Sequence, residues 1–120
     1  MKTGGTKRVV LVTCGSTAEA LKIARAVVHK RLAACANVFS APVESVYPWK
    51  GKVEEAREYL LIIKTTARRL KPLEKEVKRL HSYEVPEFVA LPVAAGSREY
   101  LQWIEGNVKG RSAASHQTRI

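Results

Sequence analysis

The chain has 120 residues, of which 46% are hydrophobic and 27% are charged. This length fits one domain with one hydrophobic core, and the composition excludes an intrinsically disordered chain. The longest apolar runs cover only a few residues, whereas a membrane-spanning helix needs about 20. The basic start of the chain is followed by only a short apolar segment, so it does not resemble a signal peptide. We therefore expect a soluble, cytoplasmic protein that has no membrane partner.

The charge balance is basic, with 21 Lys and Arg residues against 11 Asp and Glu residues and a net charge of +10. Much of the excess falls within residues 19–31 and 68–79, two segments that we expect to be helical. A basic surface raises the rate of encounter with anions, including nucleic acids. More often, such helix faces only keep a small domain soluble. We do not expect nucleic-acid binding, because the first predicted strand offers no aromatic side chain on which a base could stack.

The first third of the chain predicts a strand followed by a helix. Arg8–Cys14 is β-branched and almost entirely apolar, which is typical of a central strand buried on both faces. Ser16, with Glu19 three residues later, forms a capping-box pattern that predicts the start of a helix. Polar residues then recur at three- to four-residue steps through residues 17–34, which indicates an amphipathic helix lying on a sheet.

The middle of the chain predicts a long β-hairpin. Cys35–Tyr47 alternates loosely and is interrupted by Pro42, which favours an edge strand or a bulge. After a turn at Pro48–Lys52, the chain returns as a second strand over Val53–Thr66. Each arm has roughly a dozen residues, against the usual 5–6. A hairpin of this length would expose its edges, which native proteins often cover with another subunit.

The last third predicts a helix, a strand and a helix. The second helix should begin near Lys71, the fourth strand should cover Phe88–Val93, and the final helix should run from Ser97 to about Val108. The element order is thus β-α-β-β-α-β plus a terminal helix. This order predicts an α+β, ferredoxin-like fold with a long hairpin between the second and third strands and an added C-terminal helix.

The predicted domain organisation has three parts. A single ferredoxin-like domain covers residues 8–108, preceded by an N-terminal extension at residues 1–7. Small and polar residues predominate after the last helix, so we expect residues 109–120 to form a mobile C-terminal tail.

The predicted topology brings several reactive side chains to one end of the sheet. The first strand ends and the first helix begins there, so Cys14, Ser16 and Thr17 should lie near the segment between the second helix and the fourth strand. That segment contains His81 and Glu87. A thiolate, an imidazole and a carboxylate could hold a copper or zinc ion. The helix start at Ser16 and Thr17 could instead hold a small anion.

Each candidate also has a simpler interpretation. Cys14 is one of only two cysteines, and a buried thiol most often acts as a small hydrophobic residue. Ser16 is fully explained as a helix cap. His81 could satisfy carbonyl groups at the end of a basic helix. A Cys–His pair used as nucleophile and base would need a third orienting group, so we do not expect an enzyme.

The sequence resembles the CutA family of divalent-cation tolerance proteins over residues 8–108. The matching stretches are Val12–Cys14, Lys30–Asn37, Ser45–Lys52, Ile63–Thr66, His81–Glu87, Ala90–Val93 and Tyr100–Ile104. The resemblance implies a ferredoxin-like subunit in a homotrimer whose long hairpins pair between subunits. It also implies an architecture like that of the PII signal proteins, a link to copper tolerance and divalent-metal binding, and no established catalytic activity.

The resemblance carries over only part of a metal site. His81 matches the family's His-x-Tyr motif, whereas Leu80 stands where some members have a second histidine, and Cys14 lies two positions after the thiol of the copper-binding pattern. We therefore expect a trimeric, non-enzymatic protein that binds copper or another divalent ion weakly at His81, Cys14 and Glu87. The alternative is a PII-like sensor of small anions or a scaffold for protein partners. The residues expected at the trimer interface are Tyr47, Trp49, Tyr83 and Trp103.

Overall fold

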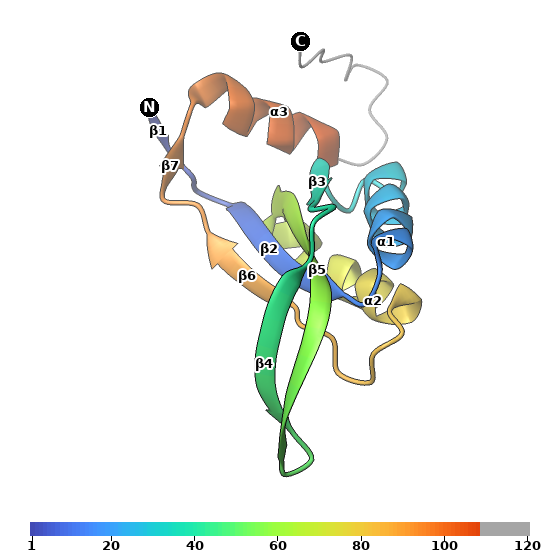
Figure 1. The fold of residues 1–120 in the computed structure, drawn as a ribbon. Coiled ribbons are helices and arrows are strands. Elements are labelled where there is room, and N and C mark those ends of the chain that lie inside the picture. Colours follow the sequence, from blue (N-terminus) through green and yellow to red (C-terminus); the bar gives the residue numbers. More distant parts are fainter. Residues whose placement is uncertain (109–120) are drawn as a thin grey trace.

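A computed structural model describes residues 1–108 of the chain. The predicted tail at residues 109–120 lies outside the described residues. The central feature is an antiparallel sheet with the strand order β3-β5-β2-β6, to which a further strand, β4, is added by pairing with β5. Two helices, α1 and α2, pack together beside this sheet (Figure 1). The prediction of an α+β, ferredoxin-like fold is therefore confirmed.

The two central strands are β2 (Lys7–Cys14) and β5 (Lys52–Thr66). They pair antiparallel along the whole of β2, from Lys7 opposite Thr66 to Cys14 opposite Tyr59. Val10 and Val12 are fully buried, as the apolar and β-branched sequence of this segment predicts. The edge strands of this arrangement are β3 (Cys35–Val38) and β6 (Val89–Pro92).

The long hairpin is present, but its first arm consists of two strands. β3 pairs with the C-terminal half of β5, and β4 (Val43–Trp49) pairs with its N-terminal half. The segment from Phe39 to Pro42 lies between them, so the prediction of one interrupted strand over Cys35–Tyr47 is refined to two strands. Proline has no N–H to donate to a ladder, which favours a break at this point. The β4–β5 hairpin extends well beyond the body of the molecule (Figure 1).

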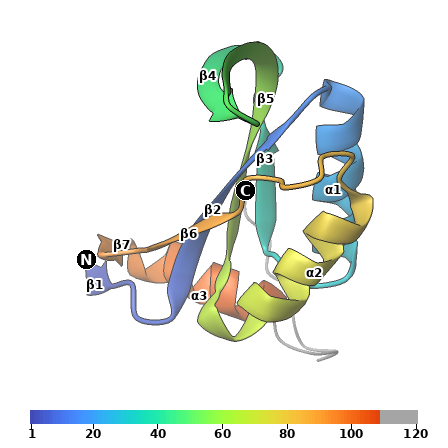
Figure 2. The same ribbon diagram turned by 90° about the horizontal axis from the view of Figure 1, so that it is seen from below.

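Helices α1 (Thr17–His29) and α2 (Leu70–Leu80) form the layer that buries the core. Figure 2 shows the two helices side by side, away from the hairpin. The core combines strand residues such as Ile63 with helix residues such as Ile23 and Leu73, all of which are fully buried. A short 3-10 helix, η1 (Ala67–Arg69), leads from β5 into α2.

The first helix ends earlier than residue 34, where the sequence pattern placed its end. Arg31 has a φ of 57°, in the left-handed region, and the Leu32 N–H donates to the carbonyl of Val27 at 2.9 Å. This reversal is typical of a helix C-terminus. It is required because the chain must turn back to enter β3 on the sheet edge.

Two short paired strands were not expected from the sequence pattern. The short strand β1 (Lys2–Thr3) pairs with β7 (Ala95–Gly96), so part of the predicted N-terminal extension is paired with the segment before α3 (Arg98–Val108). Both strands have only two residues, and no periodicity can be recognised over so short a length.

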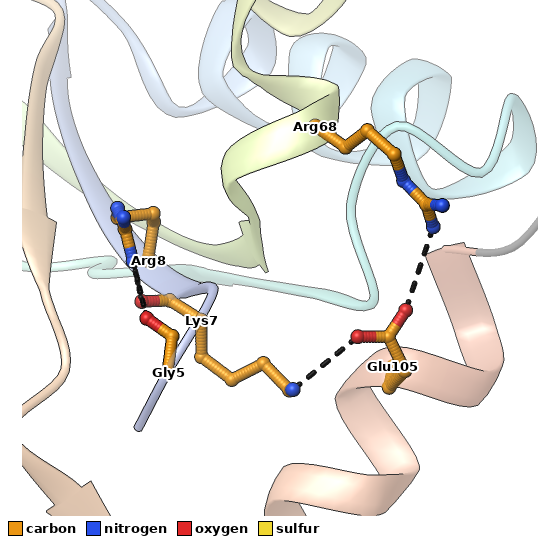
Figure 3. A network of polar contacts seen from close by, with 5 residues as sticks. All are labelled: Gly5, Lys7, Arg8, Arg68 and Glu105. Atoms are coloured by element: carbon orange, nitrogen blue, oxygen red, sulfur yellow. Dashed lines mark hydrogen bonds and ion pairs between the residues drawn. The ribbon is translucent and has the colours of Figure 1, made fainter. Parts of the chain in front are cut away.

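Ion pairs attach the third helix, α3, to the rest of the domain. Glu105 accepts from Lys7 Nζ at 3.3 Å and from an Arg68 guanidinium nitrogen at 3.5 Å (Figure 3). Leu101, Ile104 and Val108 form the buried side of α3. The helix is therefore tied both to the start of β2 and to η1. Among residues 1–108, no helix has the length and apolar character needed to cross a membrane.

Candidate functional site

Three chain segments meet where β2 ends. Cys14 is the last residue of β2, α1 begins three residues later at Thr17, and His81 caps the C-terminus of α2. The imidazole Nε2 of His81 lies 2.7 Å from the carbonyl oxygen of Thr13. The predicted convergence of Cys14, the start of α1 and His81 is therefore present in the structure.

Both ring nitrogens of His81 have hydrogen-bond partners. The Tyr83 N–H donates to Nδ1 at 3.1 Å, which leaves the ring proton on Nε2 to be donated to Thr13 O. The His81 side chain is completely buried. These contacts hold the ring in one orientation, with Nδ1 as the acceptor and Nε2 as the donor.

Glu19 is the third member of the cluster, and the sequence analysis did not assign it to a metal site. Its carboxylate accepts from the Ser82 N–H at 2.9 Å and from Ser82 Oγ at 3.2 Å. One oxygen also lies 3.8 Å from His81 Nδ1. The capping-box pattern pointed to Glu19 as a helix-start residue, but its carboxylate bonds to the segment after α2. Only the packing of α1 against α2 brings that segment within reach.

Cys14, Glu19 and His81 together form a possible metal site. One ligand atom from each residue can be chosen so that all three lie within 4.8 Å of one another. Glu87 was expected to provide the carboxylate but is not part of this group, so Glu19 takes its place among the described residues. A thiol, an imidazole and a carboxylate form a donor set that suits zinc or copper.

The electrostatics of the cluster favour the protonated thiol. Cys14 is fully buried, and burial together with the charges of Glu19 and Glu58 raises its pKa to about 12. The thiol is therefore protonated at neutral pH, and an ion would have to displace this proton. An ion would also have to compete with the Tyr83 N–H for His81 Nδ1. The residue types fit a divalent ion, but the arrangement requires these two adjustments before all three can bind.

An open cavity of about 590 Å³ lies next to the cluster and includes Thr13. Three of the four predicted interface residues line it, namely Tyr47, Trp49 and Tyr83, and Glu87 lies on it as well. Trp103 lies elsewhere, on α3, where its ring stacks on Tyr100 at 5.6 Å. Sequence reasoning missed Glu58, a buried cavity residue contributed by the long strand β5.

The carboxylates of this cavity influence one another. Partial burial, together with the charge of Glu58, raises the pKa of Glu87 above its usual value. Burial and a hydrogen bond to Glu58 also raise the pKa of Tyr83, so the phenol remains protonated and donates to the Glu58 carboxylate. Tyr83 thus links the Cys14, Glu19 and His81 cluster to the cavity, since its N–H bonds to His81 and its hydroxyl bonds to Glu58.

The sequence analysis offered the N-terminus of α1 as an alternative anion site, but side chains of the protein already make contacts there. Ser16 Oγ accepts the Glu19 N–H at 3.1 Å, as expected of an N-cap, and Thr17 is the first residue of α1. The Glu19 carboxylate lies in this first turn, and a negative charge there opposes the binding of an anion. The geometry gives no support to the anion-sensor alternative.

Comparison with known proteins places the chain in a family. Residues 8–107 match the model of the family described as CutA1 divalent ion tolerance protein. The chain belongs to this family. The resemblance inferred from the sequence motifs is confirmed, and the matched range includes the whole Cys14, Glu19 and His81 cluster.

Relatives within the CutA1 family are similar over most of the chain. A divalent-cation tolerance protein CutA from Thermus thermophilus is 48% identical over 101 residues, which cover 84% of this chain and 97% of the relative. A protein CutA of Arabidopsis thaliana, described as chloroplastic, is 44% identical over 84% of this chain, which spans only 55% of that relative. A solved structure of the Thermus thermophilus protein superimposes with a TM-score of 0.83, covering 86% of this chain and 99% of the other.

Proposed function

We propose that this CutA1-family protein acts in divalent-cation tolerance by binding the ion at Cys14, Glu19 and His81. The observation that carries this proposal is the approach of three potential ligand atoms, from three separate segments, to within 4.8 Å. When bound, the ion would supply positive charge to a site that otherwise holds a protonated thiol, an imidazole and the Glu19 carboxylate. No chemical step is required of it, so the proposed role is non-enzymatic.

The donor set favours a soft or borderline ion, copper or zinc, over magnesium or calcium, which prefer oxygen ligands alone. We infer weak binding. The buried thiol must lose a proton, and His81 Nδ1 must give up its bond to the Tyr83 N–H. Both costs lower the affinity relative to a site whose ligands are free.

We also propose that the working form is a homotrimer. Side chains alternate along β2, so Val9 and Leu11 lie on the sheet face opposite to that of the buried core residue Val10. Val89 and Leu91 of β6 are about half exposed, and they pair with Leu11 and Val9 of β2. Apolar surface of this kind is typical of a subunit interface. The overhanging hairpin provides further strand edges that a neighbouring subunit could cover.

A cytoplasmic location is part of the proposal. Both cysteines are free thiols, which suits a reducing compartment. The name of the Arabidopsis thaliana relative places that protein in the chloroplast. Localisation of a fluorescently tagged chain in its source cells would test the cytoplasmic assignment.

The ion site is tested by calorimetric titration of Cu(II) and Zn(II) into the full chain carrying His116→Gln, which removes a histidine of the tail. We expect stoichiometric binding that His81→Ala abolishes and that Glu19→Gln weakens. His29→Ala is the control, because His29 lies at the end of α1 and is exposed.

Light scattering on the same samples would report the assembly state. Binding that survives His81→Ala would place the ion elsewhere. Affinity no tighter than about millimolar, or roughly −4 kcal/mol, would mean that the Cys14, Glu19 and His81 cluster is a structural core of the protein and that its link to cation tolerance is indirect.

A further inference from the structure

The cavity beside the cluster contains a buried carboxylate without a positive partner. Glu58 is only 6% exposed, and its carboxylate accepts a hydrogen bond from the Tyr83 hydroxyl. Among residues 1–108, no lysine, arginine or histidine forms an ion pair with it. Burying an unpaired charge is costly, so such groups normally have a cationic partner. This carboxylate is therefore complementary to a cation that the described part of the chain does not supply.

The walls of the cavity also suit a cation that carries apolar groups. Tyr47, Trp49 and Tyr83 contribute aromatic surface, and Glu84 and Glu87 add two more carboxylates. Aromatic faces attract ammonium and guanidinium groups while also packing against aliphatic chains. Concave, partly apolar cavities with a few convergent polar groups are typical sites for small molecules. A volume of about 590 Å³ leaves room for a small organic molecule.

The rim of the cavity already attracts a cation of the protein. Lys50 Nζ lies 4.0 Å from a Glu84 carboxylate oxygen and 5.8 Å from the centre of the Trp49 ring. This lysine is at the hairpin tip, and its side chain is 75% exposed. It pairs with the rim carboxylate, so that within residues 1–108 no ion pair is formed by Glu58 or Glu87. The cavity is thus lined by carboxylates although the chain as a whole carries a net charge of +10.

We propose that this cavity binds a small organic amine through its primary ammonium group, which is held by Glu58 and Glu87 and packed against Tyr47 and Trp49. A primary ammonium is favoured over a quaternary one, because the carboxylate oxygens need N–H donors. It is favoured over a bare metal ion, because three of the lining residues are aromatic. This site differs from the proposed ion site, and Tyr83 contacts both.

The test is a calorimetric and thermal-shift titration of the full chain with 1,4-diaminobutane. The matched probes are 1,4-butanediol, which has the same length without charge, tetramethylammonium, which has charge without N–H groups, and magnesium chloride. We expect only the diamine to bind and raise the melting temperature. Glu58→Gln should weaken its binding at least about tenfold, as is typical for loss of a charged hydrogen bond. Glu74→Gln, on the exposed side of α2, is the charge-matched control and should leave binding unchanged.

Two further variants separate this proposal from its alternatives. Lys50→Met should tighten diamine binding, because it removes the competing cation at the rim. Glu19→Gln should weaken the binding of Zn(II) but leave the diamine response intact, so failure of one site is distinguishable from failure of the other.

The ligand-free Glu58→Gln protein gives an independent readout. We expect its melting temperature to equal or exceed that of the unsubstituted chain, because an unpaired buried charge is removed. A lower melting temperature with loss of assembly would show that a basic residue of a second copy neutralises Glu58, and would overturn the proposal. An absent diamine response, a response unchanged by Glu58→Gln, or an equal response to magnesium would also overturn it.

Discussion

Hydrogen bonds fix the position of the His81 ring between the end of β2 and the segment after α2. Its two ring nitrogens are engaged by Thr13 O and by the Tyr83 N–H, and its side chain is completely buried. The residue therefore joins β2 to the segment after α2 even without an ion. His81→Ala should consequently affect stability as well as ion binding, which is why Glu19→Gln is the more selective variant for the proposed site.

Glu76 predicts a pH dependence of stability. Its carboxylate is 8% exposed and lies 2.8 Å from both Lys30 Nζ and an Arg79 guanidinium nitrogen. Hydrogen bonds from Arg79 and Lys30 lower the pKa of Glu76 from 4.5 to about 2 in the folded protein. A lowered folded pKa means that this stabilisation is fully present above about pH 4.5 and is lost as the pH falls towards 2.

Urea unfolding between pH 6 and pH 2.5 would measure this effect. We expect Glu76→Gln to be less stable than the unsubstituted chain by about 1–2 kcal/mol at neutral pH, since its partners are largely exposed and screened. The difference should shrink as the pH falls from 4.5 towards 2, because the Glu76 carboxylate takes up a proton in the unfolded chain before it does so in the folded protein. Glu74→Gln, which removes an exposed pair with Lys78 on the same helix, is the control. A constant difference across the pH range would contradict the assignment.

Helix α1 illustrates how a local sequence pattern can predict an element but not all of its contacts. The N-cap at Ser16 forms as predicted, with its side chain accepting the Glu19 N–H. The Glu19 carboxylate instead bonds to Ser82, which is 63 residues away in sequence. Helix-start rules describe neighbours within one turn, and they contain no information about a segment brought near by packing.

The cap at Ser16 gives a prediction at the level of this helix. Ser16→Ala should lower the free energy of unfolding by about 1 kcal/mol, because it leaves an N–H at the helix start without an acceptor. Ser16→Asp should retain most of the stability. Hydrogen exchange should report faster exchange at the first turn of α1 and unchanged exchange in α3.

Ser97 provides a matched comparison, since its Oγ accepts the Tyr100 N–H at 3.2 Å at the start of α3. Ser97→Ala should accelerate exchange in α3 and not in α1. Equal effects of the two variants on both helices would mean that the serines act through global stability rather than as local caps.

In residues 1–108, helices α1 and α2 pack on one face of the sheet, and the apolar side chains of Val89 and Leu91 on β6 are exposed. This exposed apolar surface supports assembly into the proposed homotrimer. Leu91→Glu would place a charge on this surface, where Leu91 is 44% exposed. We expect this variant to dissociate to monomers in size-exclusion chromatography with light scattering, while the unsubstituted chain elutes at three times the mass of one chain.

Leu21→Glu is the control for this experiment, because Leu21 lies on α1 with a similar exposure of 38%. It should leave the trimer intact. Circular dichroism should show helix content retained in both variants. Dissociation caused by Leu21→Glu but not by Leu91→Glu would place the interface elsewhere. An unsubstituted chain that is monomeric at micromolar concentration would contradict the homotrimer.

Much of the fold was accessible from the sequence because its elements have strong local patterns. The buried strand at Arg8–Cys14, the cap at Ser16 and the long strand ending at Thr66 were all predicted near their observed positions. The break near Pro42 was anticipated as an interruption but not as a division into two strands. The β1–β7 pair was missed because two residues carry no recognisable period.

The sequence by itself determined the order of the main strands and helices, the family and the end of the sheet at which the thiol and the imidazole meet. Only the tertiary structure decided that Glu19, and not Glu87, joins Cys14 and His81, and that Glu58 is buried beside Tyr83. The physical reason is the sequence separation over which each interaction acts. Helix and strand patterns arise from neighbours a few residues apart, whereas the placement of a carboxylate depends on the packing of α1 on α2 and on the register of β5.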